Sequence, residues 1–291
     1  MPTGDRAGGA RGRPVAKLRA GEGTPIYLSV SPFGTGRLAE AVRIARAMRC
    51  AGVDANVAIL NASEPVAALA DVPVAVVSVS WQSQHPADLS ACAALARRLG
   101  AGTVNVYPTL SPGDDPALAR EALVRAIETA LEVSDEDRPG LTLENALERP
   151  PGLASAFDAW ISILKAVDSP RFRGTLDAAN FIASGDAACL PRIVAEAALW
   201  IGYVHAKGIV PFSAEMHERE PFRRVWEGAG RWLAAPAGEG APDYRELLPG
   251  LLHAGYSGAI GVEPFDCEPP IRRAIAFLRG VLRVRASSGD E

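Results

Sequence analysis

The sequence predicts a single-domain (β/α)8 barrel, the TIM-barrel fold class, with a long loop after the seventh strand. Eight short apolar segments alternate with helical or connecting segments, and regular alternation of this kind predicts a parallel sheet that closes at eight units. Four segments in the second half each end near a side chain that can bind a metal ion, namely Glu144, Asp177, His205 and Glu263. These four residues follow one another at intervals of 33, 28 and 58. Since an average barrel unit has about 31 residues, two intervals are one unit each, and the third is one unit plus an insertion.

The two ends of the chain differ in composition from its middle. The first 23 residues are rich in Gly and Arg and contain no apolar stretch, so we interpret 1–23 as a flexible, mildly basic N-terminal arm and not as a secretory signal. The catalytic barrel is expected over 24–286, followed by a short C-terminal tail over 287–291.

Charge and composition favour a small-molecule ligand. The chain carries a formal net charge of −4 and has a pI near 5.7, which gives no basis for nucleic-acid binding. No apolar run approaches the roughly 18–20 residues of a membrane span. The four cysteines show no CxxC spacing, so a zinc finger and a disulfide framework are both excluded. We expect a cytoplasmic protein with a sugar-like substrate and no nucleic-acid or membrane partner, either monomeric or a homo-oligomer.

The first half of the chain contains four predicted strands. They are expected over 26–30, 57–60, 72–79 and 103–107. Helices are expected over 36–50 and 88–99, where apolar residues recur with a period near 3.6. Another helix begins at Asp115-Pro116, with Asp as N-cap and Pro at the first helical position. Gly52 is interpreted as the residue that ends the first helix.

The second half contains the other four strands and the long insertion. Strands are expected over 141–144, 174–177, 203–205 and 260–263, with helical stretches near 153–166, 190–199, 244–253 and 268–285. A Rossmann-type fold would need a Gly-rich turn after the first strand, but the segment 31–36 has only one Gly-x-Gly and contains Pro32, which favours the barrel. The largest departure from regular spacing is 206–243, and a long loop beside a site is a natural lid or specificity loop.

The four side chains at the strand ends predict a metal centre. Active sites of these barrels lie at the C-terminal ends of the strands, where the four would meet. Singly, each has an ordinary structural interpretation, such as a helix cap for Glu144 or Asp177 and a hydrogen-bonded core histidine for His205. Together, three buried carboxylates would repel one another without a cation. Oxygen-rich ligation with one nitrogen suits Mn²⁺ or Mg²⁺, with Zn²⁺ and Co²⁺ as alternatives.

Short motifs around these residues resemble the strand-end motifs of the xylose isomerase-like TIM barrels. The motifs are Leu143-Glu144-Asn145, Thr175 to Asn180, Val204 to Gly208, and Gly255 to Gly258 with Val262-Glu263. The resemblance covers roughly residues 25–285, and the order and spacing of the motifs are its specific part. That superfamily includes sugar phosphate isomerases and epimerases, ketose 3-epimerases, hydroxypyruvate isomerases and inosose dehydratases.

The resemblance implies a reaction and a role for each residue. It makes Glu144, Asp177, His205 and Glu263 the four ligands of a divalent cation. A metal that chelates the hydroxyl and carbonyl oxygens of a ketose stabilises the enediolate formed when the adjacent carbon loses its proton. By the same resemblance, one of the two glutamates would take that proton and the other would return it. The leading hypothesis is therefore a metal-dependent isomerase or epimerase of carbohydrate metabolism, acting on a small ketose or hydroxy-ketone.

Two positions depart from the ketose 3-epimerase pattern. Those enzymes typically carry a substrate-binding histidine where this chain has Asn180, and a substrate-binding arginine where it has Pro211. Arg219 or Arg223 from the long loop could replace the arginine. The substrate-binding candidates are therefore Trp81, Tyr107, Asn180, Lys207 and Arg219.

Lys207, two residues beyond His205, either contacts a substrate oxygen or is a solvated loop lysine. Endonuclease members of the superfamily need several more histidines for a trinuclear zinc site, and the chain has four in all, so DNA repair is excluded.

Two alternative functions remain open at the level of sequence. An inosose-type dehydratase, which is a lyase, would use the same metal and the same enediolate and then expel a β-hydroxyl. A non-catalytic barrel that binds a sugar would explain the missing histidine and arginine, although the complete ligand set argues against it.

Overall fold

The computed structural model describes residues 23–60, 69, 72–132, 139–147, 152–263 and 265–286. The predicted arm lies outside the described residues except for residue 23, and the predicted tail 287–291 lies outside them entirely. Among the helices within these ranges, none is both long and apolar enough to cross a membrane.

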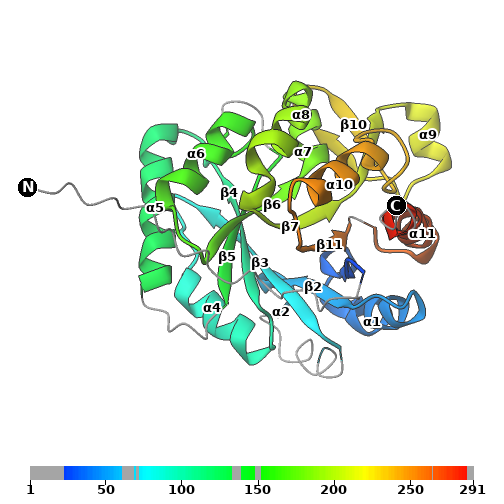
Figure 1. The fold of residues 1–291 in the computed structure, drawn as a ribbon, viewed down its shortest axis with the longest axis horizontal. Coiled ribbons are helices and arrows are strands. Elements are labelled where there is room, and N and C mark those ends of the chain that lie inside the picture. Colours follow the sequence, from blue (N-terminus) through cyan, green and yellow to red (C-terminus); the bar gives the residue numbers. More distant parts are fainter. Residues whose placement is uncertain are drawn as a thin grey trace, which may run out of the picture.

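Eight parallel strands form a closed barrel in the order β1-β11-β7-β6-β5-β4-β3-β2, which confirms the predicted fold class (Figure 1). The strands are β1 (Ile26–Ser29), β2 (Gly52–Asn56), β3 (Val74–Gln82), β4 (Thr103–Thr109), β5 (Gly140–Glu144), β6 (Phe172–Asp177), β7 (Ile201–Ala206) and β11 (Ala259–Val262). Closure pairs the first strand with the last, since Ile26 pairs with Ile260. The C-terminal ends of all eight strands therefore lie around one mouth of the barrel.

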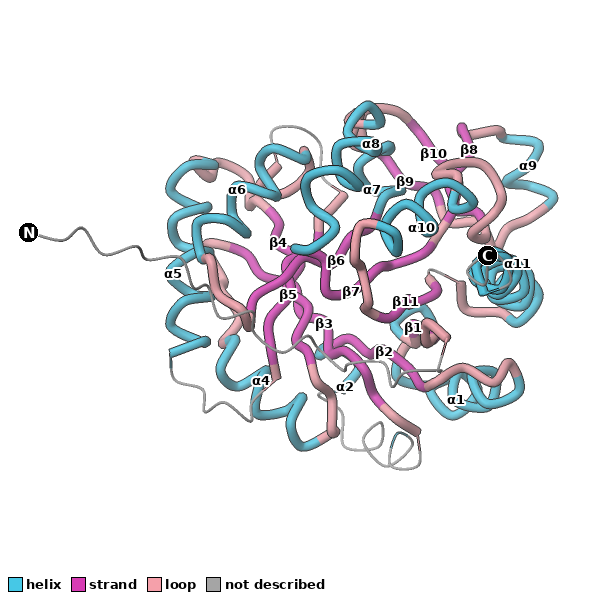
Figure 2. The backbone as a smooth tube through the Cα atoms, in the orientation of Figure 1, coloured by secondary structure: helices cyan, strands magenta, loops and turns pink. Residues whose placement is uncertain are grey.

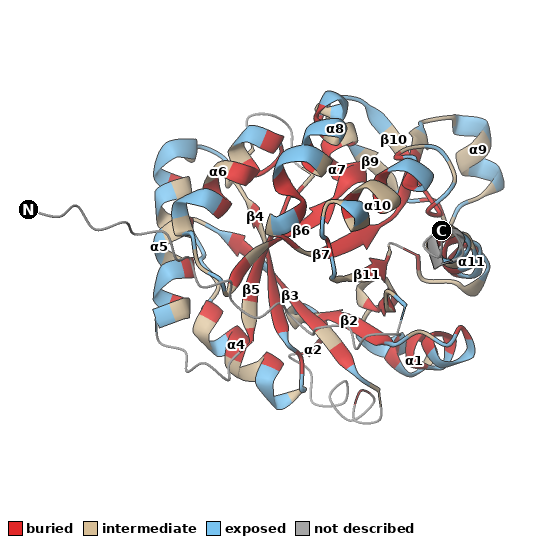
Figure 3. Ribbon diagram, in the orientation of Figure 1, coloured by how far each residue is buried: buried red, intermediate tan, exposed pale blue. Residues whose placement is uncertain are grey.

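Helices surround the barrel and bury their apolar faces against it (Figure 3). They are α1 (Leu38–Ala47), α2 (Val57–Leu60), α4 (Leu89–Arg98), α5 (Pro116–Glu132), α6 (Phe157–Val167), α7 (Ala178–Ala183), α8 (Leu190–Arg192), α10 (Tyr244–His253) and α11 (Glu268–Ala286). The stretch predicted as a helix over 190–199 is α8 followed by one π-helical and one 3-10 segment.

The prediction for the second strand is wrong. Val57–Leu60 is the helix α2, and the strand is β2, immediately before it. A run of four apolar residues does not distinguish a buried strand from a buried helix. Asn56 begins the helix, since its side-chain Oδ1 accepts a hydrogen bond of 2.8 Å from the backbone N–H of Ala58.

Gly52 was predicted to end the first helix, but it is the first residue of β2, where it pairs with Tyr27. The residue with positive φ in the preceding turn is Arg49, at 54°. A Cβ atom at Gly52 would lie 2.1 Å from the backbone oxygen of Pro73, so the close approach of β2 to the start of β3 requires glycine there.

An aromatic cluster fixes the end of β5. The Trp160 ring of α6 packs edge-on against Phe181 of α7, with ring centroids 5.8 Å apart. Its Nε1–H donates a hydrogen bond of 2.9 Å to the carbonyl oxygen of Leu143. Gly174 of β6 leaves room for this ring, because a Cβ there would lie 2.2 Å from Trp160 Cζ2. The backbone next to Glu144 is therefore held by buried packing.

The long segment after the seventh strand has secondary structure of its own. It contains β8 (Gly208–Pro211), α9 (Ala214–Arg219), β9 (Val225–Glu227) and β10 (Arg231–Ala235). The three strands form an antiparallel sheet in the order β8-β10-β9, which lies beside α7 at the edge of the barrel (Figure 2). We call residues 208–235 the inserted sheet.

The inserted sheet is attached to several parts of the barrel mouth. Arg224 Nη2 donates to the carbonyl oxygen of Pro32, at 3.2 Å, and the Phe222 ring packs edge-on against Phe265 at 6.1 Å. On the other side, the Ala229 N–H donates to the carbonyl oxygen of Ala183 at the end of α7, at 2.8 Å. These contacts make the insertion a wall of the barrel mouth.

Candidate metal centre

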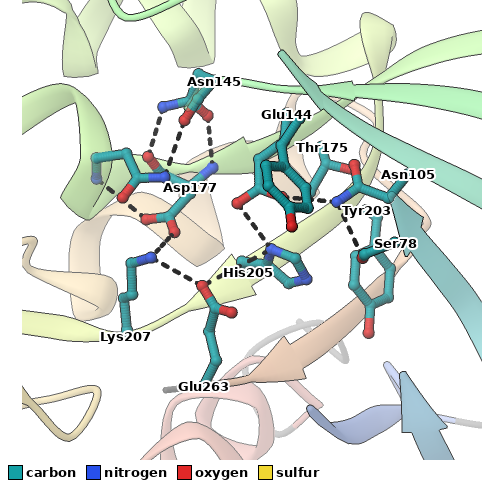
Figure 4. A network of polar contacts seen from close by, with 12 residues as sticks. Ser78, Asn105, Glu144, Asn145, Thr175, Asp177, Tyr203, His205, Lys207 and Glu263 are labelled. Carbon is teal, nitrogen blue, oxygen red and sulfur yellow. Dashed lines mark hydrogen bonds and ion pairs between the residues drawn. The ribbon is translucent and has the colours of Figure 1, made fainter. Parts of the chain in front are cut away.

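Glu144, Asp177, His205 and Glu263 meet at the mouth of the barrel, as their spacing predicts. Glu144 and Asp177 are the last residues of β5 and β6, His205 lies near the end of β7, and Glu263 directly follows β11. One potential ligand atom from each lies within 4.8 Å of those of the other three. Figure 4 shows the four side chains pointing toward one another.

Strand register brings the central pair together. Asp177 pairs with His205 across β6 and β7, and His205 pairs with Gly261 across β7 and β11. Parallel neighbouring strands place paired residues side by side at the same height in the barrel, so the ligand candidates need no long loop to converge.

An exchange of hydrogen bonds holds the ends of β5 and β6 together. Asn145 Nδ2 donates to the carbonyl oxygen of Asp177, and the Asp177 N–H donates to Asn145 Oδ1, both at 2.7 Å. The Asp177 Oδ1 atom accepts from the backbone N–H of Asn180 at 3.1 Å and so caps α7. The structural interpretation of Asp177 as a helix cap is therefore correct as well, and it leaves Oδ2 for the centre.

A chain of polar side chains orients Glu144. Asn105 Nδ2 donates to Glu144 Oε2 at 2.6 Å and to Ser78 Oγ at 3.2 Å. The Asn105 side-chain oxygen accepts from Thr142 Oγ1 at 3.1 Å, and this hydroxyl accepts from Thr175 Oγ1 at 2.8 Å. The other carboxylate oxygen, Glu144 Oε1, lies 3.1 Å from His205 Nδ1.

Carboxylates lie near both ring nitrogens of His205. Nδ1 faces the centre, since Glu263 Oε1 also lies within 3.8 Å of it. Nε2 lies 3.7 Å from Asp54 Oδ2. Asp54 is 1% exposed, and the Tyr203 hydroxyl donates to the same oxygen at 3.0 Å. A carboxylate behind the second nitrogen of a histidine is the usual arrangement around a metal-binding imidazole.

The Lys207 ammonium lies beside two of the ligand candidates. Nζ is 2.5 Å from Asp177 Oδ2 and 2.8 Å from Glu263 Oε1. The residue is 7% exposed, so it is not the solvated loop lysine that one interpretation of the sequence allowed.

Burial and neighbouring charges shift the pKa values of these groups. Burial raises the pKa of Asp177 to about 7, although the Lys207 ammonium opposes the rise. Burial would also raise the pKa of Glu263, but the charges of Lys207 and His205 outweigh it and lower that pKa to about 2. Burial lowers the pKa of His205, and the carboxylates of Glu144 and Glu263 reverse this and bring it well above its usual 6.5. The carboxylates therefore stabilise a positive charge that is placed among them.

The donor set fits a divalent cation. Three carboxylates face one ammonium and one imidazole, so even with a protonated imidazole the acidic groups outnumber the basic ones around the centre. His205 Nε2 is buried and has no hydrogen-bond partner, so a modest shift of the ring could complete the bond to Asp54. Glu144, Asp177, His205 and Glu263 could hold the ion, and oxygen ligands with one nitrogen suit several divalent metals.

A pocket of about 340 Å³ opens above the centre. Its described lining comprises Ser29, Ser31, Asn56, Ser78, Tyr107, Thr109, Glu144, Ala146, Leu147, Asn180, His205, Lys207, Trp226 and Glu263. Three of the five predicted substrate-binding residues, Tyr107, Asn180 and Lys207, are among these.

The other two predicted substrate-binding residues lie elsewhere. Trp81 is 1% exposed and belongs to the hydrophobic core. Arg219 is the last residue of α9, and its side chain is 68% exposed. Arg223, the other candidate from the long loop, is buried and donates to Glu220, Glu239 and the carbonyl oxygen of Ala234. Trp226 of β9 is the residue that the inserted sheet contributes to the pocket.

Sequence reasoning missed Asp54 and the serine and asparagine residues of the first three strands. The misplaced second strand explains the omission of Asp54 and Asn56, since both belong to β2. A buried carboxylate within the apolar stretch Val53-Asp54-Ala55 was the available signal.

The comparisons with known proteins agree with this geometry. A protein-family model described as "Xylose isomerase-like TIM barrel" matches residues 78–281. No curated protein matches the chain. A xylose isomerase-like TIM barrel protein from Mycobacterium smegmatis, solved in complex with magnesium, is 17% identical, with a TM-score of 0.65 over 90% of this chain and 97% of that one.

Two further solved structures have similar sequence identities, coverages and TM-scores. An L-ribulose 3-epimerase is 17% identical, with a TM-score of 0.67 over 92% of this chain and 98% of that one. The IolI protein, solved with a zinc atom, is 14% identical, with a TM-score of 0.67 over 89% of this chain and 98% of that one. At these identities the structural likeness shows the fold, and the family assignment rests on the match over residues 78–281.

Proposed function

Because this chain belongs to the family of xylose isomerase-like TIM barrels, we propose that it is a divalent-metal-dependent isomerase or epimerase of a small ketose or hydroxy-ketone. The observation that carries the proposal is the position of two glutamates around one pocket. Glu144 and Glu263 come from strands on either side of β6 and β7, and both line the pocket. Solved members of this fold include ketose epimerases, which supports the choice of reaction.

The chain's own residues provide for proton transfer. Glu144 and Glu263 lie on the same pocket with His205 between them, at 3.1 and 3.8 Å from its Nδ1. A carbon placed between the two carboxylates could lose its proton to one and regain a proton from the other. When bound, a divalent cation would supply the positive charge that stabilises the enediolate formed in between.

The lining favours a neutral polyhydroxy substrate over a phosphorylated one. Hydroxyl and amide groups dominate the wall formed by β1 to β4 and the turn after β1, namely Ser29, Ser31, Asn56, Ser78, Tyr107 and Thr109. Among the described lining residues, Lys207 is the one cationic side chain apart from His205, and its ammonium already lies between two carboxylates. The described lining therefore offers a phosphate no cationic side chain that is not already paired with a carboxylate.

Metal analysis followed by solvent-deuterium exchange tests the proposal. We expect the purified protein to bind a divalent ion and to exchange deuterium into one member of a panel of free ketoses and keto-inositols. Glu144→Gln and Glu263→Gln should each lower that exchange by about 100-fold or more, whereas Glu246→Gln, an exposed glutamate of α10, should leave it unchanged.

The same panel distinguishes the alternatives. Exchange with loss of water would identify a dehydratase, and binding without exchange across the panel would identify a sugar-binding barrel. Absence of any bound or activating divalent ion would contradict both enzymatic readings.

A further inference from the structure

Lys207 places a positive charge inside the group of ligand candidates. Its Nζ lies 2.5 Å from Asp177 Oδ2 and 2.8 Å from Glu263 Oε1, so one ammonium bridges two of the four proposed ligands (Figure 4). Asp177 is fully buried and Lys207 nearly so. An ion pair at this depth is weakly screened by salt and strongly coupled to any further charge brought near it.

The backbone holds Lys207 in this position. The Tyr244 hydroxyl accepts from the Lys207 N–H at 3.1 Å and donates to the Lys207 carbonyl oxygen at 3.0 Å. Tyr244 is 0% exposed. The start of the lysine side chain is therefore fixed, while its four-carbon stem can still turn at its far end.

The inserted sheet adds an aromatic contact to the same ammonium. Lys207 Nζ lies 4.7 Å from the centroid of the Trp226 ring of β9, within the range of a cation–π interaction. An ammonium that leaves the carboxylates could stay in contact with this ring and remain inside the pocket.

We propose that Lys207 is a built-in counter-ion of the metal centre, which holds Asp177 and Glu263 together before a divalent cation binds and then competes with that cation for both carboxylates. The inference rests on the proposed function, because it takes these residues as ligands of the cation. Lys207 is thus a positioning residue that lowers the affinity of the centre for metal. The affinity is lower because the cation must replace the ammonium that stabilises Asp177 and Glu263 in the metal-free protein.

Metal titration of three variants tests the competition. Lys207→Met keeps the length of the side chain and removes its charge, Lys207→Arg keeps the charge, and Lys165→Met makes the same change at an exposed lysine of α6. We expect calorimetry with Mn²⁺ to give a Kd at least about tenfold lower for Lys207→Met, since a like charge in contact with two of the ligands would no longer oppose binding. Lys207→Arg and Lys165→Met should stay within about threefold of the wild type.

Thermal unfolding in EDTA tests whether Lys207 stabilises the metal-free centre. Lys207→Met should unfold at a lower Tm than the wild type, because it leaves two buried carboxylates without a counter-charge, and Mn²⁺ should raise its Tm by more than that of the wild type. A Kd for Lys207→Met equal to or higher than that of the wild type would overturn the inference, as would a lowered Kd for Lys207→Arg.

The wild type alone provides a test that does not depend on how the variants fold. Crystals grown in EDTA and then soaked in Mg²⁺ should show Nζ leaving at least one of Asp177 and Glu263. Unchanged contacts in the metal-bound crystal would overturn the inference. Binding of equal strength by wild type and Lys207→Met leaves the proposed function standing and removes only the role of Lys207, whereas no binding by either protein overturns the metal centre itself.

Discussion

The carboxylate of Asp54 faces the far edge of the His205 imidazole, with Oδ2 3.7 Å from Nε2. The two residues are 151 positions apart in the chain and belong to β2 and β7, which are not neighbours in the barrel. Their approach occurs across the barrel interior. It gives the histidine a carboxylate behind it while Nδ1 faces Glu144.

Asp54→Asn should weaken metal binding by about 10–100-fold, the usual effect of losing the partner of a metal-binding histidine. The amide oxygen of asparagine carries no full negative charge, so it is a weaker acceptor for the His205 Nε2–H than the carboxylate is. Calorimetric titration with Mn²⁺ measures the change. Tyr203→Phe, which removes only the hydroxyl that donates to Asp54, should have a smaller effect, and an Asp54→Asn protein with wild-type affinity would contradict this role.

Removal of metal should destabilise the protein, because the cation would bind the folded state and relieve the repulsion among three carboxylates. At a free ion concentration of 100 times Kd, the free energy of unfolding should rise by about 2.7 kcal/mol. That is a rise in Tm of about 5–10 °C for a domain of this size. Differential scanning calorimetry with EDTA and then with added Mn²⁺ measures it. In His205→Ala the Tm should respond little to Mn²⁺; a response as large as that of the wild type would exclude His205 as a ligand.

Metal affinity should increase with pH. Burial raises the pKa of Asp177 to about 7, above its ordinary 3.8, and the pKa of His205 is also raised, so protons compete with the cation for both groups near neutral pH. We expect affinity at pH 8 to exceed that at pH 6 by about tenfold or more. An affinity that is the same at both pH values would contradict the raised pKa of Asp177.

The same shift has a consequence for the metal-free protein. Because the folded-state pKa of Asp177 is raised, its contribution to stability is present below about pH 4 and is lost as pH rises toward 7. Glu263, with its pKa lowered to about 2, acts in the opposite sense, and its contribution is lost as pH falls from about 4.5 toward 2. Urea unfolding in EDTA at several pH values, with Asp177→Asn as the comparison, should show a smaller loss between pH 4 and 7 in the variant.

Asn145→Ala should destabilise the fold at the barrel mouth. The side chain makes two hydrogen bonds to Asp177, both of 2.7 Å and both buried, and their loss leaves a backbone N–H and a carbonyl oxygen without partners. We expect a decrease of about 1–3 kcal/mol in the free energy of unfolding for each such group, measured by urea denaturation. Asn180→Ala removes one bond to the Asn145 carbonyl oxygen and should cost less; the reverse order would contradict the importance of the exchange.

Local patterns in the sequence predict the fold. Alternation of short apolar runs with amphipathic segments predicts eight units, and the intervals between Glu144, Asp177, His205 and Glu263 follow from the length of a unit. Such features depend on neighbours along the chain, so they can be seen without a structure. The exception is β2, where a short apolar run had two interpretations and the strand was placed four to five residues too late.

Contacts across the barrel were decided by the tertiary structure alone. Asp54 reaches His205, and Trp226 of the inserted sheet reaches Lys207, because closure of the sheet and docking of the insertion bring them together. No periodicity encodes these distances. The ligand candidates were therefore visible in the sequence as strand ends. The carboxylate behind the histidine depends on which strands face each other across the closed barrel, and the ammonium between the carboxylates depends on the neighbouring order β11-β7-β6.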